Sequence, residues 1–203
     1  MKVILIPGMG CAPVARSNWY AWFAREINQR YQSDDTMAVH CDLQDFPDPY
    51  QCRESIWMPH VQKLIGDEDD DNDSNNDPSP TIIVGHSSGA ACAMRLLEQR
   101  KRPLAACILV AAAHTDLDDE DERLSGYFNR PWDWQRMAQG ASKIVLFHGT
   151  DDHLIPVREA RHIAEQLSVF AKHFEFREMN GKSHFFEPWP EILEVMDAIC
   201  KRK

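Results

Sequence analysis

Six short apolar runs, rich in Val, Ile and Leu, recur along the chain with amphipathic segments between them. They lack the alternation of apolar and polar residues that a strand with one face in water would show. Uninterrupted runs of this length are typical of parallel strands whose sheet is covered on both faces. The sequence therefore predicts six strands, at residues 2–7, 37–43, 81–85, 106–112, 142–148 and 173–179.

The amphipathic segments predict helices at 17–31, 52–65, 88–101, 157–167 and 189–202. Right-handed crossovers wind such an alternation of strands and helices into an open sheet with helices on both faces. A length of 203 residues fits one domain of this kind. The expected fold class is α/β: a three-layer α/β/α domain over 1–203 with a six-stranded, mostly parallel sheet.

The composition and the net charge exclude two classes of partner. The net charge of −10 would repel a phosphate backbone, so no nucleic-acid partner is expected. No apolar run approaches the ~20 residues that span a bilayer, so no membrane partner is expected either. Six cysteines without a C-x-x-C pair indicate reduced thiols and a cytoplasmic location rather than a disulfide framework or a zinc site.

Residues 67–77, DEDDDNDSNND, carry seven acidic groups and no apolar side chain. A segment of this composition has nothing to bury, so it predicts a disordered, solvated loop. An interaction tail or a cation-binding loop is the alternative.

The segment 81–99, TIIVGHSSGAACAMRLLEQ, passes from an apolar strand through a glycine-bracketed serine into a helix. Gly85, Ser87 and Gly89 satisfy G-x-S-x-G, the turn that lifts a nucleophilic serine above the edge of a sheet. The following helix directs its free N–H groups to the same place, which favours an anion there. Ser87 is therefore the predicted nucleophile; an ordinary helix start with Ser87 or Ser88 as N-cap is the alternative.

A serine nucleophile needs a base, and the base needs an acid that holds its tautomer. In a doubly wound hydrolase these follow the serine in the order acid, then histidine, at later strand ends. Asp151 and Asp152 follow the fifth strand, and Asp152 is preferred, although either could cap the next helix. Among nine histidines His184 alone lies in a glycine-containing turn after the last strand, so it is the predicted base. His86 and His148 are not expected to reach Ser87.

Two backbone N–H groups should stabilise the developing oxyanion: that of Ser88 and one from the loop IPGMG after the first strand. Glycines flank Met9, so its amide is the predicted second donor. A dinucleotide fingerprint is the competing interpretation of this loop, but Pro13 stands where the third glycine would be required. No cofactor and no metal are expected.

Residues 114–140 interrupt the alternation with aromatic residues and a proline. Excursions at the carboxyl end of a strand commonly cover a ligand in α/β folds. Phe128, Trp132 and Trp134 are the predicted substrate-binding residues, and a place in the core is the alternative for them.

Several of these segments together resemble the retinoblastoma-binding protein 9 family of small serine hydrolases. The resemblance covers most of the chain and rests on IPGMG, CRESIWMP, IIVGHSSGAACAMR, SGYFNRPWDW, the GTDD turn and GKSHF. It implies a compact α/β-hydrolase fold and a triad at Ser87, Asp152 and His184. The chain lacks the L-x-C-x-E motif on which the name-giving interaction of such proteins depends, which puts retinoblastoma-type binding in doubt.

The expected function is hydrolysis of a small ester or amide through an acyl-enzyme, with aminopeptidase-like cleavage as one form of the amide reaction. The partner would be a small-molecule or short peptide acyl substrate. A catalytically residual hydrolase scaffold that binds another protein is the alternative.

Overall fold

The structure is a computed structural model that describes residues 1–31, 38–66 and 79–200. The acidic segment predicted to be a loop, 67–77, lies outside the described residues. In the described part of the chain no helix is long and apolar enough to cross a membrane.

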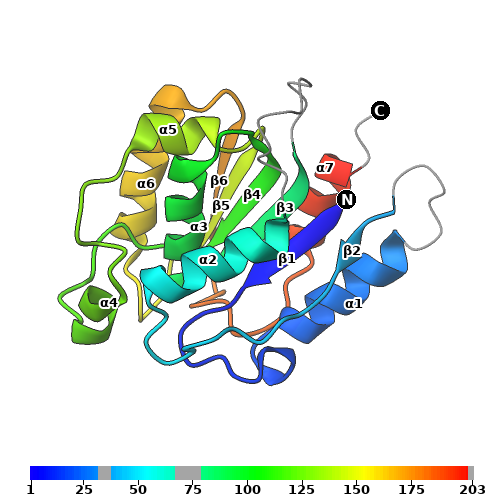
Figure 1. Ribbon diagram of the computed structural model, residues 1–203, viewed down its shortest axis with the longest axis horizontal. Helices are drawn as coiled ribbons and strands as arrows, with labels where there is room; N and C mark the ends of the chain where they lie inside the picture. Colours follow the sequence, from blue (N-terminus) through cyan, green and yellow to red (C-terminus); the bar gives the residue numbers. More distant parts are fainter. Residues whose placement is uncertain (32–37, 67–78, 201–203) are drawn as a thin grey trace.

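Six parallel strands form one sheet in the order β2-β1-β3-β4-β5-β6 (Figure 1). This confirms the α/β fold class predicted from the apolar runs. The strands are β1 (Lys2–Ile6), β2 (His40–Cys41), β3 (Ser79–His86), β4 (Leu104–Val110), β5 (Ile144–Gly149) and β6 (Phe174–Met179).

Helices cover both faces of the sheet, so successive side chains of a strand enter two different cores. In β1, Ile4 and Ile6 belong to the core that α2, α3, α5 and α6 also enter, whereas Val3 and Leu5 belong to the core that α1 and α7 enter. This explains why the strands are apolar without alternation. The helices of the first face are α2 (Glu54–Ile65), α3 (Ser88–Gln99), α5 (Trp134–Gln139) and α6 (Val157–Phe170), and those of the second are α1 (Tyr20–Arg30) and α7 (Glu191–Cys200).

The structure differs from the sequence expectation in local detail. The second strand is only two residues long and lies at the edge of the sheet, where Asn28 donates to the carbonyl of Cys41 and accepts from its N–H, both at 2.9 Å. The excursion 114–140 contains α4 (Glu120–Ser125) and α5. A 3₁₀ helix, η1 (Val14–Arg16), precedes α1.

The direction of strand order reverses between β1 and β3, because β2 lies on one side of β1 and all later strands lie on the other. Ligands of open α/β sheets bind at such a switch point, beyond the carboxyl ends of the strands. The loop after β1 and the turn after β3 are therefore neighbours at this edge.

Candidate active site

Ser87 occupies a strained turn between β3 and α3. Its backbone angles are φ 55° and ψ −123°, a conformation that non-glycine residues rarely adopt. A Cβ atom on Gly85 would lie 2.5 Å from the carbonyl oxygen of Gly89, and one on Gly89 would collide with the carbonyl oxygen of Ile6. Ser87 stands at the N-cap position of α3, but its side chain makes no capping hydrogen bond within the described part of the chain. The turn thus has the geometry expected of a nucleophile elbow.

His184 and Asp152 are joined by a hydrogen bond of 2.8 Å between Nδ1 and Oδ2. The other carboxylate oxygen, Oδ1, accepts from the N–H groups of Leu154 and Ile155, both at 2.9 Å. Burial by itself raises the pKa of Asp152, but the hydrogen bonds from His184 and the backbone outweigh it and hold that pKa below its ordinary value. Asp152 is therefore a buried, ionised acceptor behind the imidazole.

The alternative acid, Asp151, lies elsewhere. Its side chain accepts from the backbone N–H of Ser183 at 3.1 Å and is exposed to solvent. Neither aspartate caps the next helix, since α6 has Pro156 at its N-cap position. Of the two candidates, the structure brings only Asp152 to the ring of His184.

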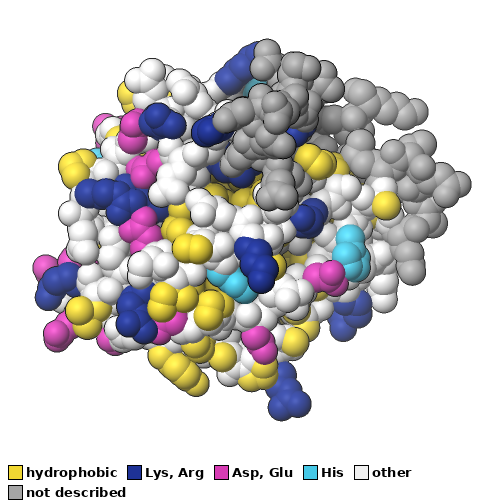
Figure 2. Space-filling view, in the orientation of Figure 1, with side chains coloured by type: hydrophobic (Ala, Val, Ile, Leu, Met, Phe, Trp, Pro, Cys, Tyr) yellow, Lys and Arg dark blue, Asp and Glu magenta, His cyan; other side chains and the backbone are white. Residues whose placement is uncertain are grey.

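A cavity of about 750 Å³ opens at the carboxyl edge of the sheet. Figure 2 shows hydrophobic side chains along the lower edge of the molecule, where the strands of Figure 1 end, and acidic side chains near the position of α4. Among the described residues no group of three or more His, Cys, Asp and Glu side chains could hold a metal ion. The cavity is lined by residues from five segments of the chain, among them Met9, Ser87, Ser88, Glu122, Phe128 and His184.

Both predicted oxyanion donors border this cavity. Around Met9, the Gly8 N–H donates to the hydroxyl of Tyr20 at 2.9 Å and the Gly10 N–H donates to Pro49 O at 2.8 Å, so the loop is held on both sides. Ser88 is the first residue of α3, where a backbone N–H has no acceptor within the helix. Met9 and Ser88 thus lie on the same cavity as Ser87.

His86 and His148 are buried, at 1% and 0% exposure. His86 contacts Tyr20 through Nδ1 and the carbonyl of His184 through Nε2, while Nε2 of His148 contacts Ile155 O at 2.9 Å. Burial lowers the pKa of both imidazoles. Both nitrogens of His86 and Nε2 of His148 are thus engaged inside the protein, whereas Nδ1 of His148 is buried with no hydrogen-bond partner in the described part of the chain.

Glu122 is a member of the site that the sequence pattern does not indicate. Its Oε1 accepts from the hydroxyl of Ser88 at 2.8 Å, which ties α4 to the start of α3. Burial raises the pKa of Glu122, with further contributions from Asp119 and Asp121 that the bond from Ser88 opposes. The only signal was an acidic run within an excursion, and such runs are usually solvated.

The predicted substrate-binding aromatics lie in two places. Phe128 lines the cavity, whereas Trp132 and Trp134 are not among the described residues that line it. Trp132 lies beneath the Arg95 guanidinium, 3.6 Å from Cζ to the ring centroid, and its Nε1 donates to His114 O. Trp134 has an edge contact with His162.

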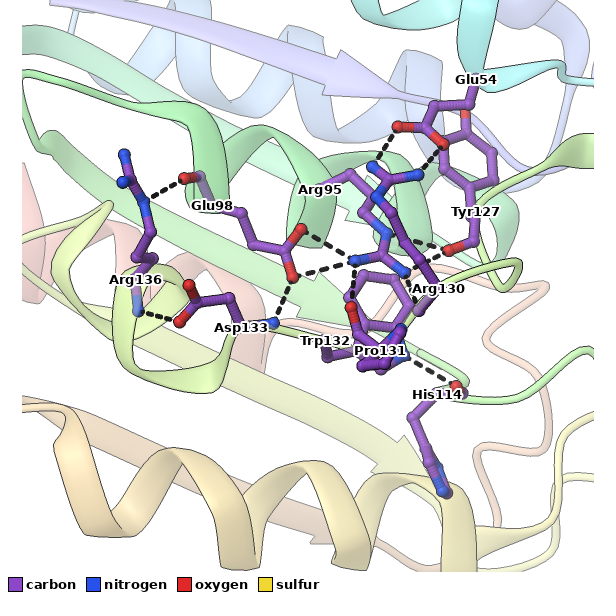
Figure 3. A network of polar contacts seen from close by, with 10 residues as sticks. All are labelled: Glu54, Arg95, Glu98, His114, Tyr127, Arg130, Pro131, Trp132, Asp133 and Arg136. Atoms are coloured by element: carbon purple, nitrogen blue, oxygen red, sulfur yellow. Dashed lines mark hydrogen bonds and ion pairs between the residues drawn. The ribbon is translucent and has the colours of Figure 1, made fainter.

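Arg95, on α3, holds the excursion in place from inside the protein (Figure 3). Its guanidinium is fully buried and donates to the carbonyls of Tyr127, Arg130 and Pro131. Both oxygens of Glu98 accept from the same group, at 3.0 and 2.9 Å. Arg95 was not predicted, because only the folded chain places these carbonyls around it.

The parallel sheet and the strained serine turn at its switch point define an α/β-hydrolase. A family model described as serine hydrolase matches residues 3–198, and the chain belongs to this family. It is 36% identical to the protein named serine hydrolase RBBP9 of Rattus norvegicus over 199 residues, which cover 98% of this chain and 95% of that protein. The resemblance inferred from the motifs is thereby confirmed.

Solved structures share the fold. The ydeN gene product of B. subtilis superposes with a TM-score of 0.79 at 20% identity, covering 99% of both chains. TT1662 from Thermus thermophilus gives a TM-score of 0.70 at 12% identity, covering 100% of this chain and 90% of the other. At these identities the likeness concerns the fold alone.

Proposed function

We propose that this serine hydrolase cleaves small esters or amides through an acyl-enzyme on Ser87, with His184 as base and Asp152 as the acid that orients it. The observation that carries the proposal is the 2.8 Å bond between His184 and Asp152 beside a cavity that Ser87 also lines. A strained serine and a buried His–Asp pair are costly features that a residual binding scaffold would have no reason to keep.

The hydrogen bond to Asp152 decides which ring nitrogen of His184 can act as the base. Because ionised Asp152 only accepts, Nδ1 of His184 carries the proton and Nε2 keeps its lone pair. Nε2 takes the hydroxyl proton as Ser87 Oγ attacks the carbonyl carbon, and then gives it to the leaving alcohol or amine. A water molecule then attacks the acyl-enzyme in the same way, with His184 again as base, and the carboxylic acid product leaves Ser87.

Backbone donors would stabilise the negative oxygen of the tetrahedral intermediate. The N–H groups of Met9 and Ser88 are the proposed pair, supported by their position on the cavity and by the bonds that hold the loop around Met9. Removing one such donor typically costs about 10²–10³ in kcat.

The walls of the cavity favour a substrate with an apolar part. Apolar side chains contribute to these walls: Leu117, Leu154, Phe128 and Phe186. Phe128 is the proposed aromatic contact with the substrate. Asp119, Asp121 and Glu122 add acidic character to the same cavity, which would attract a protonated amine and supports the aminopeptidase-like option among amides. The absence of any disulfide among the six cysteines, all within the described residues, supports a cytoplasmic location.

Turnover of nitrophenyl esters and amino-acid arylamides tests the proposal. Ser87→Ala should lower kcat/KM by roughly 10³-fold or more, because the three residues act as a unit. Ser168→Ala is the matched control, since Ser168 lies exposed on α6. Wild-type protein without turnover on either class, or full activity in Ser87→Ala, would contradict the proposal.

A further inference from the structure

A buried chain of hydrogen bonds joins the loops around the site. The N–H of Gly8 lies 2.9 Å from the hydroxyl of Tyr20, which lies 2.7 Å from Nδ1 of His86. Nε2 of the same ring lies 2.9 Å from the carbonyl oxygen of His184. Tyr20, His86 and His184 are 0%, 1% and 3% exposed, so water does not compete for these bonds.

The donor and the acceptor of each of these hydrogen bonds follow from the chemistry of the groups. The carbonyl of His184 can only accept, so Nε2 of His86 must carry a hydrogen and donate it. Burial lowers the pKa of His86 to about 3, so the ring is neutral near pH 7 and its Nδ1 has a lone pair. The hydroxyl of Tyr20 therefore donates to His86 while it accepts from the N–H of Gly8.

The chain links three separate segments of the proposed mechanism. Gly8 precedes Met9 in the oxyanion loop, His86 precedes the nucleophile, and the last acceptor is the backbone of the base itself. An aromatic cluster encloses the link: the ring of Trp19 makes edge contacts with Tyr20 at 5.0 Å, His86 at 5.9 Å and Trp189 at 4.7 Å between centroids. The three segments are thus fixed to one rigid support.

We propose that His86 and Tyr20 are positioning residues that set the oxyanion loop and the backbone of His184 relative to Ser87. The inference rests on the proposed acyl hydrolysis. His86 fixes the height of the base above the nucleophile, and Tyr20 fixes the peptide that precedes Met9. Neither side chain exchanges a proton with the substrate, so their loss should act on kcat more than on KM.

Tyr20→Phe is the most conservative test, because it removes one oxygen atom and keeps the ring in its aromatic cluster. A small displacement of reacting groups can cost up to ~10²-fold in rate, so kcat should fall roughly 10- to 100-fold while KM changes little. Tyr31→Phe is the matched control: Tyr31 is also buried, its hydroxyl donates to Asp197 at 2.6 Å, and that bond joins the residue after α1 to α7, away from the cavity. Thermal unfolding of both variants separates lost stability from lost positioning.

Two substitutions of His86 test the two hydrogen bonds of its ring separately. His86→Gln places an amide N–H near the position of Nε2 and can still donate to His184 O, whereas His86→Asn places an oxygen near Nδ1 and can accept only from Tyr20. Because His86→Gln keeps the hydrogen bond to the backbone of the base, kcat should be higher in His86→Gln than in His86→Asn. A merely structural role would not order the two variants in this way.

The result expected is a loss of kcat in Tyr20→Phe that Tyr31→Phe does not share, with partial rescue by Gln at position 86. Equal kcat in Tyr20→Phe and Tyr31→Phe, with an active wild type, would overturn this inference and leave the proposed function intact. A wild type that neither turns over an ester nor reacts with a fluorophosphonate would overturn the proposed function and this inference with it.

Discussion

Replacement of Arg95 by Met tests how the excursion is held over the cavity. Figure 3 shows the Arg95 guanidinium surrounded by the carbonyls of the excursion, with Glu98 on one side and the ring of Trp132 against its face. Methionine fills much of the same volume but donates no hydrogen bond. The substitution therefore leaves several buried carbonyls without this donor and removes the cation from Glu98, whose carboxylate keeps only the N–H of Asp133 among the partners drawn in Figure 3.

The expected cost follows from that geometry. Breaking a buried ion pair by removal of one partner costs about 3–5 kcal/mol, because the other charge stays buried. The side chain of Glu98 is 10% exposed, so it belongs to this case. A chain of 203 residues loses about 2–4 °C of Tm per kcal/mol, which predicts a decrease of roughly 6–20 °C.

Arg130→Met is the matched control for this experiment. Arg130 belongs to the same excursion and pairs with Glu54 at 2.6 Å, but its side chain is 45% exposed. Exposed pairs contribute about 0–1 kcal/mol, so the control should lose only a few degrees. Calorimetry of both variants gives the comparison, with KM for an ester as a second readout because Phe128 lies in the same segment. Equal Tm values for the two variants would refute the reasoning.

Three further predictions concern the elbow, the acid and stability at low pH. Gly89→Ala should abolish ester turnover, since its Cβ would collide with a carbonyl at the end of β1; an active variant would show that the elbow can yield. Asp152→Asn should lower kcat by roughly 10⁴-fold through the wrong tautomer of the base, and a larger loss in Asp151→Asn would reverse the assignment. Burial raises the pKa of Glu159, but the hydrogen bonds from His114 and other donors lower it to about 2, below the ordinary 4.5. Glu159 therefore adds stability that is present above pH 4.5 and is lost as the pH falls towards 2, and urea unfolding of Glu159→Gln should show a flatter acid slope; an unchanged slope would contradict this.

The sequence predicts the sheet well because its determinants are local. A strand buried on both faces must be apolar throughout, and the run 82–84 within β3 shows this directly. The bracket of Gly85 and Gly89 around Ser87 is also recognised from a short local pattern, although only the structure shows that Gly89 meets the backbone of Ile6 at the end of β1. These features were therefore found without knowledge of the tertiary structure.

Features that depend on contacts between distant segments were not predicted. Tyr20 lies 66 residues from His86, and nothing in the helical pattern around it distinguishes a hydroxyl with a role from a core ring. The sequence also leaves undecided whether Trp132 lies at the substrate site or in the core, because only the fold brings Arg95 against the face of its ring. The sequence pattern also predicts too long a second strand, 37–43, because it does not show that β2 is the two-residue edge strand His40–Cys41. The side chain of Asn28 makes hydrogen bonds to the backbone of Cys41 there.

The identity of the nucleophile is the central claim, and one measurement addresses it directly. The protein is treated with a fluorophosphonate, digested, and the modified residue is identified by mass spectrometry. We expect a single adduct on Ser87, because the strained turn presents its hydroxyl to the cavity that His184 shares. An adduct on Ser88 or another residue while Ser87 stays unmodified, or no adduct on folded protein, would contradict the account.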